Sequence, residues 1–108
     1  MEAFTVREIR NCRRFYRYCY TLARPVDEKL LNSLELFGAV HIDKLSAYSS
    51  KFRDTFKVIF DDQIEINGTV ADLQLYLTVS KQSPQLKQTL EELIHGWCHS
   101  ASVSGQNH

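Results

Sequence analysis

Glycine, proline and long apolar runs are all scarce in this chain of 108 residues. It contains only 4 Gly and 2 Pro, which excludes collagen-like repeats and glycine- or proline-rich disordered linkers. Because no run of about 18 apolar residues occurs, we expect no membrane partner. The N-terminus lacks an apolar segment of signal-peptide length, so we expect a cytoplasmic protein.

Cysteine is too rare, and too irregularly spaced, for a disulfide scaffold. The three cysteines, Cys12, Cys19 and Cys98, form no Cys-x-x-Cys pair, so reduced thiols are expected. A content of 44% hydrophobic and 24% charged residues is typical of a folded globular protein. We therefore expect one α+β domain over residues 1–99, followed by a flexible C-terminal tail over residues 100–108.

Motifs that carry catalysis or bind cofactors are also absent. Four glycines leave no phosphate-cradling loop, and no zinc-protease or nucleophile-elbow motif occurs. Asp61, Asp62 and Glu65 are interpreted as a solvated turn, because adjacent carboxylates in a turn seldom serve acid–base chemistry. We therefore expect a non-catalytic protein without a cofactor, and a small enzyme is the least favoured alternative.

Charge is balanced overall but unevenly distributed along the chain. The sequence has 13 basic and 13 acidic residues, yet the first 24 residues hold six arginines against two glutamates. The remaining residues hold seven basic and eleven acidic groups. Such a split favours an anionic partner, or self-association that pairs the basic segment with the acidic one.

Residues 6–23 fit an amphipathic helix. Thr5 and Glu8 have the spacing of a capping box, and a projection at 100° per residue separates apolar from basic side chains. A strand also fits, because aromatic residues alternate over 16–22, but a strand places arginines on both faces. We therefore predict a helix whose polar face carries Arg7, Arg10, Arg13, Arg14 and Arg17.

The rest of the chain indicates a second helix, a small sheet and a closing helix. Pro25 and the acidic pair Asp27-Glu28 mark a helix start, and residues 55–80 alternate as strands with Asn67-Gly68 as a turn. Ser83-Pro84 then begins the last helix. The predicted fold class is α+β, with two N-terminal helices, a three-stranded antiparallel β-meander and a C-terminal helix packed on the sheet. The core is expected to include Phe56, Val58, Leu75, Leu77, Leu90 and Trp97.

A winged helix-turn-helix is an alternative for the middle of the chain. Residues 43–47 then form a positioning helix, residues 50–60 a recognition helix and residues 64–79 a wing. The β-branched and aromatic residues of Thr55–Phe60 oppose this interpretation, and the acidic wing repels phosphates. Whether residues 39–60 are helical or extended stays open at this point.

The arginine face is the predicted binding site. Guanidinium groups pair well with carboxylates and phosphates, and five on one helix face repel one another unless a partner neutralises them. We expect a regulatory or adaptor protein that binds an acidic protein surface, or a homodimer in which the arginines meet the chain's own acidic half. A nucleic-acid-binding regulator is the alternative.

The last helix carries a weak candidate metal site. His95, Cys98 and His99 follow one another at i, i+3 and i+4, which places three ligand types on one helical face. A tetrahedral site needs a fourth ligand. His108 or His41 could be invoked, but nothing in the sequence requires either. We therefore interpret the histidines as the exposed end of a helix and expect no metal.

Overall fold

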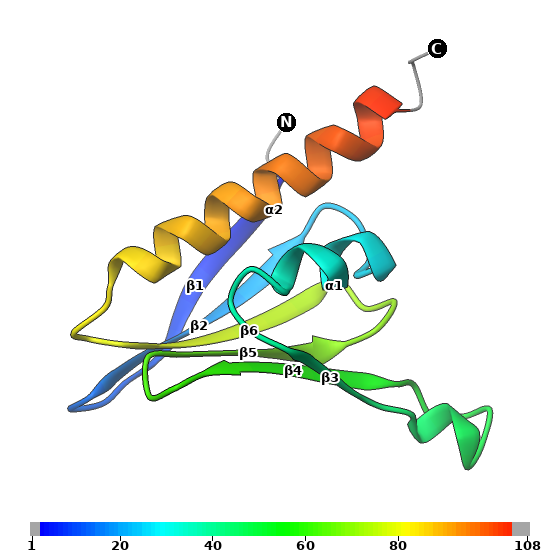
Figure 1. Ribbon diagram of the computed structural model, residues 1–108, viewed down its shortest axis with the longest axis horizontal. Helices are drawn as coiled ribbons and strands as arrows, with labels where there is room; N and C mark the ends of the chain where they lie inside the picture. Colours follow the sequence, from blue (N-terminus) through cyan, green and yellow to red (C-terminus); the bar gives the residue numbers. More distant parts are fainter. Residues whose placement is uncertain (1–2, 105–108) are drawn as a thin grey trace.

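Six antiparallel strands pair in the order β1-β2-β6-β5-β4-β3, and two helices cover one face of the sheet (Figure 1). The structure is a computed structural model that describes residues 3–104, without the side chains of residues 10, 11 and 100–104. The strands are β1 (Phe4–Asn11), β2 (Phe15–Leu22), β3 (Val40–Asp43), β4 (Thr55–Phe60), β5 (Ile64–Thr69) and β6 (Gln74–Ser80). The helices are α1 (Glu28–Leu34) and α2 (Gln85–Ser104), and Leu45–Ala47 forms one 3-10 turn.

The predicted N-terminal helix is wrong. Residues 6–23 lie in the hairpin β1–β2, in which Val6 pairs with Tyr20 and Glu8 pairs with Tyr18. The alternation of Tyr16, Tyr18 and Tyr20 places all three on one face of β2, where aromatic side chains pack well. The arginines do not fall on one helix face, because the hairpin turn interrupts their run.

The predicted fold class is therefore corrected from three strands and three helices to six strands and two helices. The expected meander over residues 55–80 is present as β4, β5 and β6, and the N-terminal hairpin joins it through the pairing of β2 with β6. The winged-helix alternative is also wrong. Its recognition helix coincides with β4, and its positioning helix is only the turn Leu45–Ala47.

The turn expected at Asn67-Gly68 lies instead at residues 70–73, where Ala71 has a positive φ of 71°. Gly68 is inside β5, opposite Phe56. A Cβ at this position would lie 3.0 Å from Phe56 Cζ, so the glycine makes room for a buried aromatic ring. The glycine is needed for packing and not for a turn.

The second predicted helix is confirmed as α1. Asp27 caps it, since the carboxylate accepts a hydrogen bond of 3.0 Å from the Leu30 N–H. Leu30 and Leu34 are fully buried beneath it. The chain leaves the helix at Gly38, whose φ of 157° suits glycine and where an added Cβ would lie 3.0 Å from the Ile59 carbonyl oxygen.

The closing helix α2 is also present, and it extends further than expected. Leu90, Ile94 and Trp97 pack on the sheet and α1, and the six residues predicted for the core are all buried. The expected tail, 100–108, begins within this helix, which continues to Ser104. Residues 105–108 lie outside the described part of the chain.

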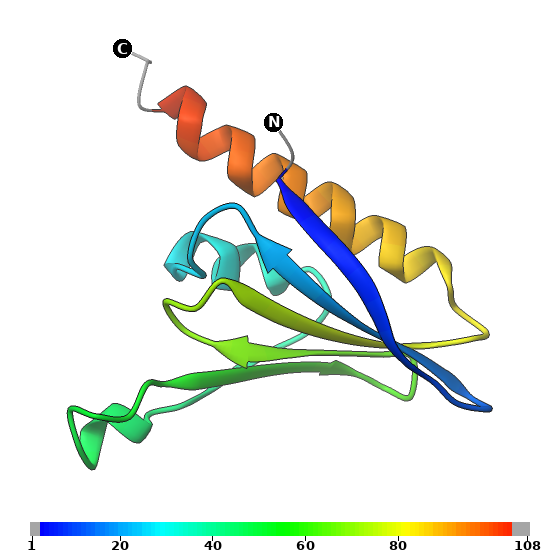
Figure 2. The same ribbon diagram turned by 180° about the vertical axis from the view of Figure 1, so that it is seen from behind.

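Both helices lie on the same face of the sheet, and the opposite face is left uncovered (Figures 1 and 2). Strand alternation places Tyr20, Leu77, Ile66 and Val58 on the covered face, where they form one core with the helices. Within residues 3–104, no helix is long and apolar enough to cross a membrane. The uncovered face therefore presents one side of the whole sheet without helices over it.

Candidate functional site

A row of side chains crosses the uncovered face from one edge of the sheet to the other. Its members occupy successive register positions on all six strands, so they share one face. From β1 to β3 the row consists of Arg7, Cys19, Tyr76, Asn67, Lys57 and His41. Except for Cys19, all of these side chains are polar or amphipathic, in contrast to the apolar covered face.

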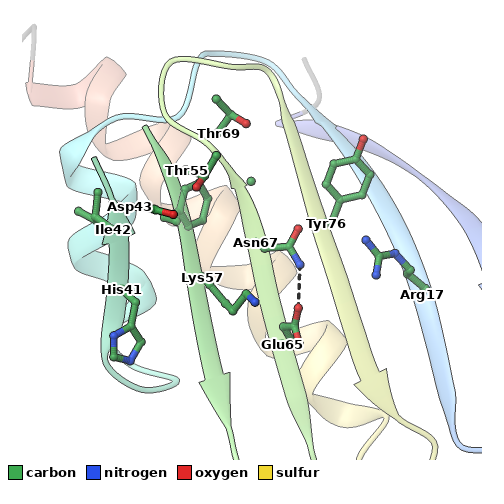
Figure 3. Close-up of a pocket in the computed structure, with 12 residues that line it drawn as sticks. Arg17, His41, Ile42, Asp43, Thr55, Lys57, Glu65, Asn67, Thr69 and Tyr76 are labelled. Atoms are coloured by element: carbon green, nitrogen blue, oxygen red, sulfur yellow. Dashed lines mark hydrogen bonds between the residues drawn. The ribbon is translucent and has the colours of Figure 1, made fainter. Parts of the chain in front are cut away.

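The centre of this face is a shallow hollow of about 750 Å³. Figure 3 shows Arg17 and Tyr76 on one side of it, and His41 and Asp43 on the other. Lys57, Glu65 and Asn67 lie between them (Figure 3). We call this surface, with Thr55 and Thr69 at one end, the open-face hollow.

Arg17 and Tyr76 form one wall of the hollow. The Arg17 guanidinium lies 5.6 Å from the centre of the Tyr76 ring, a cation–π contact. Arg17 Nη1 donates to Thr78 Oγ1 at 3.5 Å, and the Tyr76 hydroxyl donates to Gln74 Oε1 at 3.1 Å. These contacts hold the half-buried guanidinium in place on the sheet.

The floor of the hollow combines an amide, a carboxylate and an amine. Asn67 Nδ2 donates to Glu65 Oε2 at 3.0 Å, which is drawn as a dashed line in Figure 3. Lys57 pairs with Asn67 across β4 and β5 and is exposed. The floor therefore offers donors from Lys57 and Arg17, with a carboxylate between them.

Neither cation of the hollow is neutralised by an ion pair. The ion pairs found in residues 3–104 are Arg24–Asp27 and Lys87–Glu91, both away from this face. Arg17 contacts only neutral groups, and Glu65 accepts from Asn67. An incoming carboxylate or phosphate can therefore pair with Arg17 and Lys57 without first breaking an ion pair.

Cys19 and His41 lie far apart on the uncovered face. Cys19 is 2% exposed and lies on β2, whereas His41 lies on β3. Four strand spacings separate the two, which corresponds to about 19 Å. The face suits recognition by charge and hydrogen bonds, and it offers no Cys–His pair.

The five arginines predicted as one stripe are separated by the hairpin. Arg7 and Arg17 lie on the uncovered face, and Arg13 and Arg14 lie exposed in the turn between β1 and β2. The side chain of Arg10 lies outside the described residues. The structure thus brings only Arg17 into the hollow.

The turn arginines lie in a second concavity of about 960 Å³ at the end of the sheet. Arg13, Arg14 and Lys81 line it together with Asp61 and Asp62 of the β4–β5 turn. Acidic and basic groups of the same chain therefore line one concavity here. An external anion competes with Asp61 and Asp62 at this end of the sheet.

The weak metal candidates are not arranged as a site. His95 and His99 are exposed with their ring centres 6.3 Å apart, and the His95 ring lies 5.2 Å from that of Phe4. Cys98 is half-buried against the core. In the described part of the chain, no group of three His, Cys, Asp or Glu side chains could hold a metal ion.

Most residues of the hollow escaped the sequence analysis. Lys57 and Tyr76 belong to no motif. Glu65 and Asn67 were assigned to turns, but both lie within β5. A signal was nevertheless present, because they occupy the polar phase of strands whose apolar phase was used to predict the core. The polar positions that alternate with the apolar ones in these strands place the four side chains on one face of the sheet.

No family model matches the chain, and neither a curated protein nor a solved structure shows a match.

Proposed function

We propose that this protein is a non-catalytic adaptor or regulatory module whose open-face hollow binds an acidic segment of a partner protein. The observation that carries the proposal is the placement of Arg17 and Lys57, two cations without an ion pair, on either side of Asn67. Carboxylates accept hydrogen bonds from both groups, and the guanidinium can bind a carboxylate through two of its N–H groups.

An extended acidic segment fits this surface better than a single small anion. The hollow is open and shallow, so it cannot enclose a small molecule as most ligand pockets do. Arg7 continues the basic groups toward the β1 edge of the same face. Glu65 and Asp43 limit the negative charge that the hollow accepts, and they favour a partner that alternates carboxylates with neutral donors.

Single-stranded nucleic acid is the second candidate, and the Arg17–Tyr76 contact favours it. A guanidinium stacked on an aromatic ring on an uncovered sheet face resembles the platforms on which bases stack. Phe56, which also lines the hollow, is buried, so only the rings of Tyr76 and His41 in this lining are open to a base. The carboxylates of Asp43 and Glu65 repel a phosphate backbone. We therefore place nucleic acid second.

The test compares two charge reversals on opposite faces of the sheet. Lys57→Glu changes the hollow, whereas Lys29→Glu makes the same charge change on exposed α1. With a fluorescein-labelled glutamate-rich peptide in fluorescence anisotropy, we expect Lys57→Glu to raise the Kd about tenfold or more, since it replaces attraction by repulsion. Lys29→Glu should stay within about twofold, and circular dichroism should show both variants folded.

Two results would overturn the proposal. Equal effects of the two reversals would mean that binding follows net charge and not the hollow. Tighter binding of oligouridylate than of the acidic peptide, with a steep salt dependence, would select the nucleic-acid candidate.

The proposed cellular location is the cytoplasm. Cys19 and Cys98 are free thiols, and free thiols persist most readily in a reducing compartment.

A homodimer in which arginines meet the chain's own acidic half is the alternative to a partner protein, and it is checked by light scattering at rising salt. Dissociation above physiological salt would support it, and a monomer at low salt would exclude it.

A further inference from the structure

The strand β3 is an edge of the sheet with one side unpaired. Its four residues pair with β4, and no other strand of the described chain lies on its far side. An edge strand presents backbone N–H and C=O groups that can pair with another extended chain. The opposite edge, β1, is less suited to this, because its register is irregular between Glu8 and Arg10.

A groove of about 430 Å³ runs between β3 and one face of α1. The residues of β3 that point toward the helices, Val40 and Ile42, line it together with Leu31 and Val70. Ile42 is 43% exposed, although Phe56, its partner on β4, is buried. The groove is therefore an apolar slot beside an unpaired strand edge.

The rim of this groove is acidic. Glu28 and Glu35 project from α1 and Asp54 lies at the start of β4, while Lys44 is the basic residue of the lining. Hydrogen bonds from the Ser46 hydroxyl and N–H, at 2.7 and 3.0 Å, lower the pKa of Asp54 and keep it ionised. The rim thus attracts a positively charged occupant.

We propose that an extended peptide binds this groove as an added strand beside β3, with apolar side chains toward Ile42 and Val40 and lysine or arginine beside the acidic rim. Backbone hydrogen bonds to β3 supply affinity, and the alternate side chains in the groove supply selectivity. This site lies on the helix-covered side of the sheet. Its lining shares Ile42 with the open-face hollow, and the other lining residues of the two sites differ.

A second copy of this chain is a less suitable occupant. Pairing β3 with β3 about a twofold axis brings the same groups of both copies together. Glu28, Glu35 and Asp54 of each copy then face those of the other, and like charges repel. The charge of the rim therefore favours a basic peptide over self-association.

The first experiment uses a short fluorescein-labelled peptide in which valine alternates with lysine and arginine. Anisotropy should show saturable binding, and replacing its cations by glutamate should weaken it at least about tenfold. Two further versions carry backbone N-methyl groups on odd or on even residues. Because alternate N–H groups of a strand point to the same side, strand addition requires one version to lose binding while the other keeps it.

Matched variants locate the site on the protein. Ile42→Lys places a charge in the groove, whereas Ile59→Lys makes the same change on the opposite face at a residue of similar exposure, 47%. We expect a Kd at least about tenfold higher for Ile42→Lys and a change within about twofold for Ile59→Lys. Glu35→Gln removes one rim charge and should weaken binding by a smaller factor than Ile42→Lys does. Its control, Glu92→Gln, lies outside the groove and should leave binding unchanged.

Amide NMR gives the decisive readout. Binding at the groove should shift the amide signals of β3 and α1 and slow hydrogen exchange along β3. Shifts confined to Arg17, Lys57 and Tyr76 would place the peptide in the open-face hollow and overturn the proposal. The proposal would also be overturned if both N-methylated peptides lost binding equally, or if neither lost it. A dimer formed through β3 without peptide would overturn it as well.

Discussion

At the scale of single residues, Asp27 connects three parts of the fold. Its carboxylate accepts from the Leu30 N–H at 3.0 Å and from Trp97 Nε1 at 2.9 Å, and it pairs with Arg24. The Arg24 guanidinium also lies 4.7 Å from the centre of the Trp97 ring. One side chain thus caps α1 and ties it to α2 and to the segment after β2.

Replacing this side chain should destabilise the protein. We expect Asp27→Ala to lower the free energy of unfolding by about 2–4 kcal/mol, because it removes a helix cap and leaves the buried Trp97 N–H without its acceptor. Urea unfolding followed by Trp97 fluorescence measures this. The control Glu28→Ala, at the next and exposed position, should cost no more than about 1 kcal/mol.

The same comparison should depend on pH. Burial raises the pKa of Asp27, but the hydrogen bonds from Leu30 and Trp97 and the charge of Arg24 outweigh it and lower the pKa below 3.8. Because the pKa of Asp27 is lower in the folded state than in the unfolded state, its ionised carboxylate adds stability at pH values above the unfolded-state pKa. This stability is lost as the pH falls through the folded-state pKa. The difference between wild type and Asp27→Ala should therefore shrink below about pH 4. A constant difference down to pH 2 would contradict this account of Asp27.

At the scale of secondary-structure elements, α2 is held by apolar packing and by one polar cluster. The Tyr20 hydroxyl donates to Glu91 Oε2 at 2.9 Å, and Lys87 Nζ donates to the same oxygen at 2.5 Å. Burial, followed by the hydrogen bond and the charge of Glu91, raises the pKa of Tyr20, so its hydroxyl stays protonated. Lys87 also lies 4.8 Å from the centre of the Tyr18 ring, which joins the helix to β2.

Truncation in the apolar contact of α2 should be costly. Leu90 is fully buried, so we expect Leu90→Ala to reduce the free energy of unfolding by about 2–5 kcal/mol through lost burial and a cavity. The exposed neighbour Gln88→Ala is the control and should change it by less than about 0.5 kcal/mol. Chemical denaturation measures both. A cost below about 0.5 kcal/mol for Leu90→Ala would place Leu90 outside the core.

At the scale of the whole molecule, the sheet is built from neighbours in the chain except for one pairing. Hairpins join β1 to β2, and β3 through β6 follow one another. Only β2 with β6 brings together distant parts of the sequence. This pairing makes β6 a central strand, and Leu75, Leu77 and Val79 on it are fully buried.

The position of each strand should be visible in hydrogen exchange. We expect the amides of β6 to exchange most slowly, at rates set by global unfolding, because both edges of β6 are paired and its core face is buried. Amides of β3 should exchange much faster, since this strand is short and at an edge. Exchange measured residue by residue by NMR tests the order. Equal protection of β3 and β6 would show that β3 is not a free edge in solution.

Much of the covered side could be predicted from the sequence, and the open-face hollow could not. Apolar alternation over residues 55–80 and the stripe of α2 identify the core because burying apolar surface stabilises any fold that this pattern permits. Residues 6–23 satisfy both a 3.6-residue and a two-residue period, so a helix and a strand both fit the local sequence. The helix prediction, which placed the arginines on one face, was therefore wrong. The choice between helix and strand depends on the pairing with β6, which local sequence does not contain.

By itself, the sequence determined that the six residues predicted for the core are buried, that α1 begins at Asp27 and that a helix follows the last strand. These features follow from side chains close together in the sequence: an acidic cap, a proline and a periodic apolar stripe. Only the tertiary structure decided that β2 lies beside β6, that Arg17 meets Tyr76 and that β3 is left as an edge beside α1. Strand neighbours are chosen by contacts between distant segments, so the surfaces proposed for binding arise only when the sheet assembles.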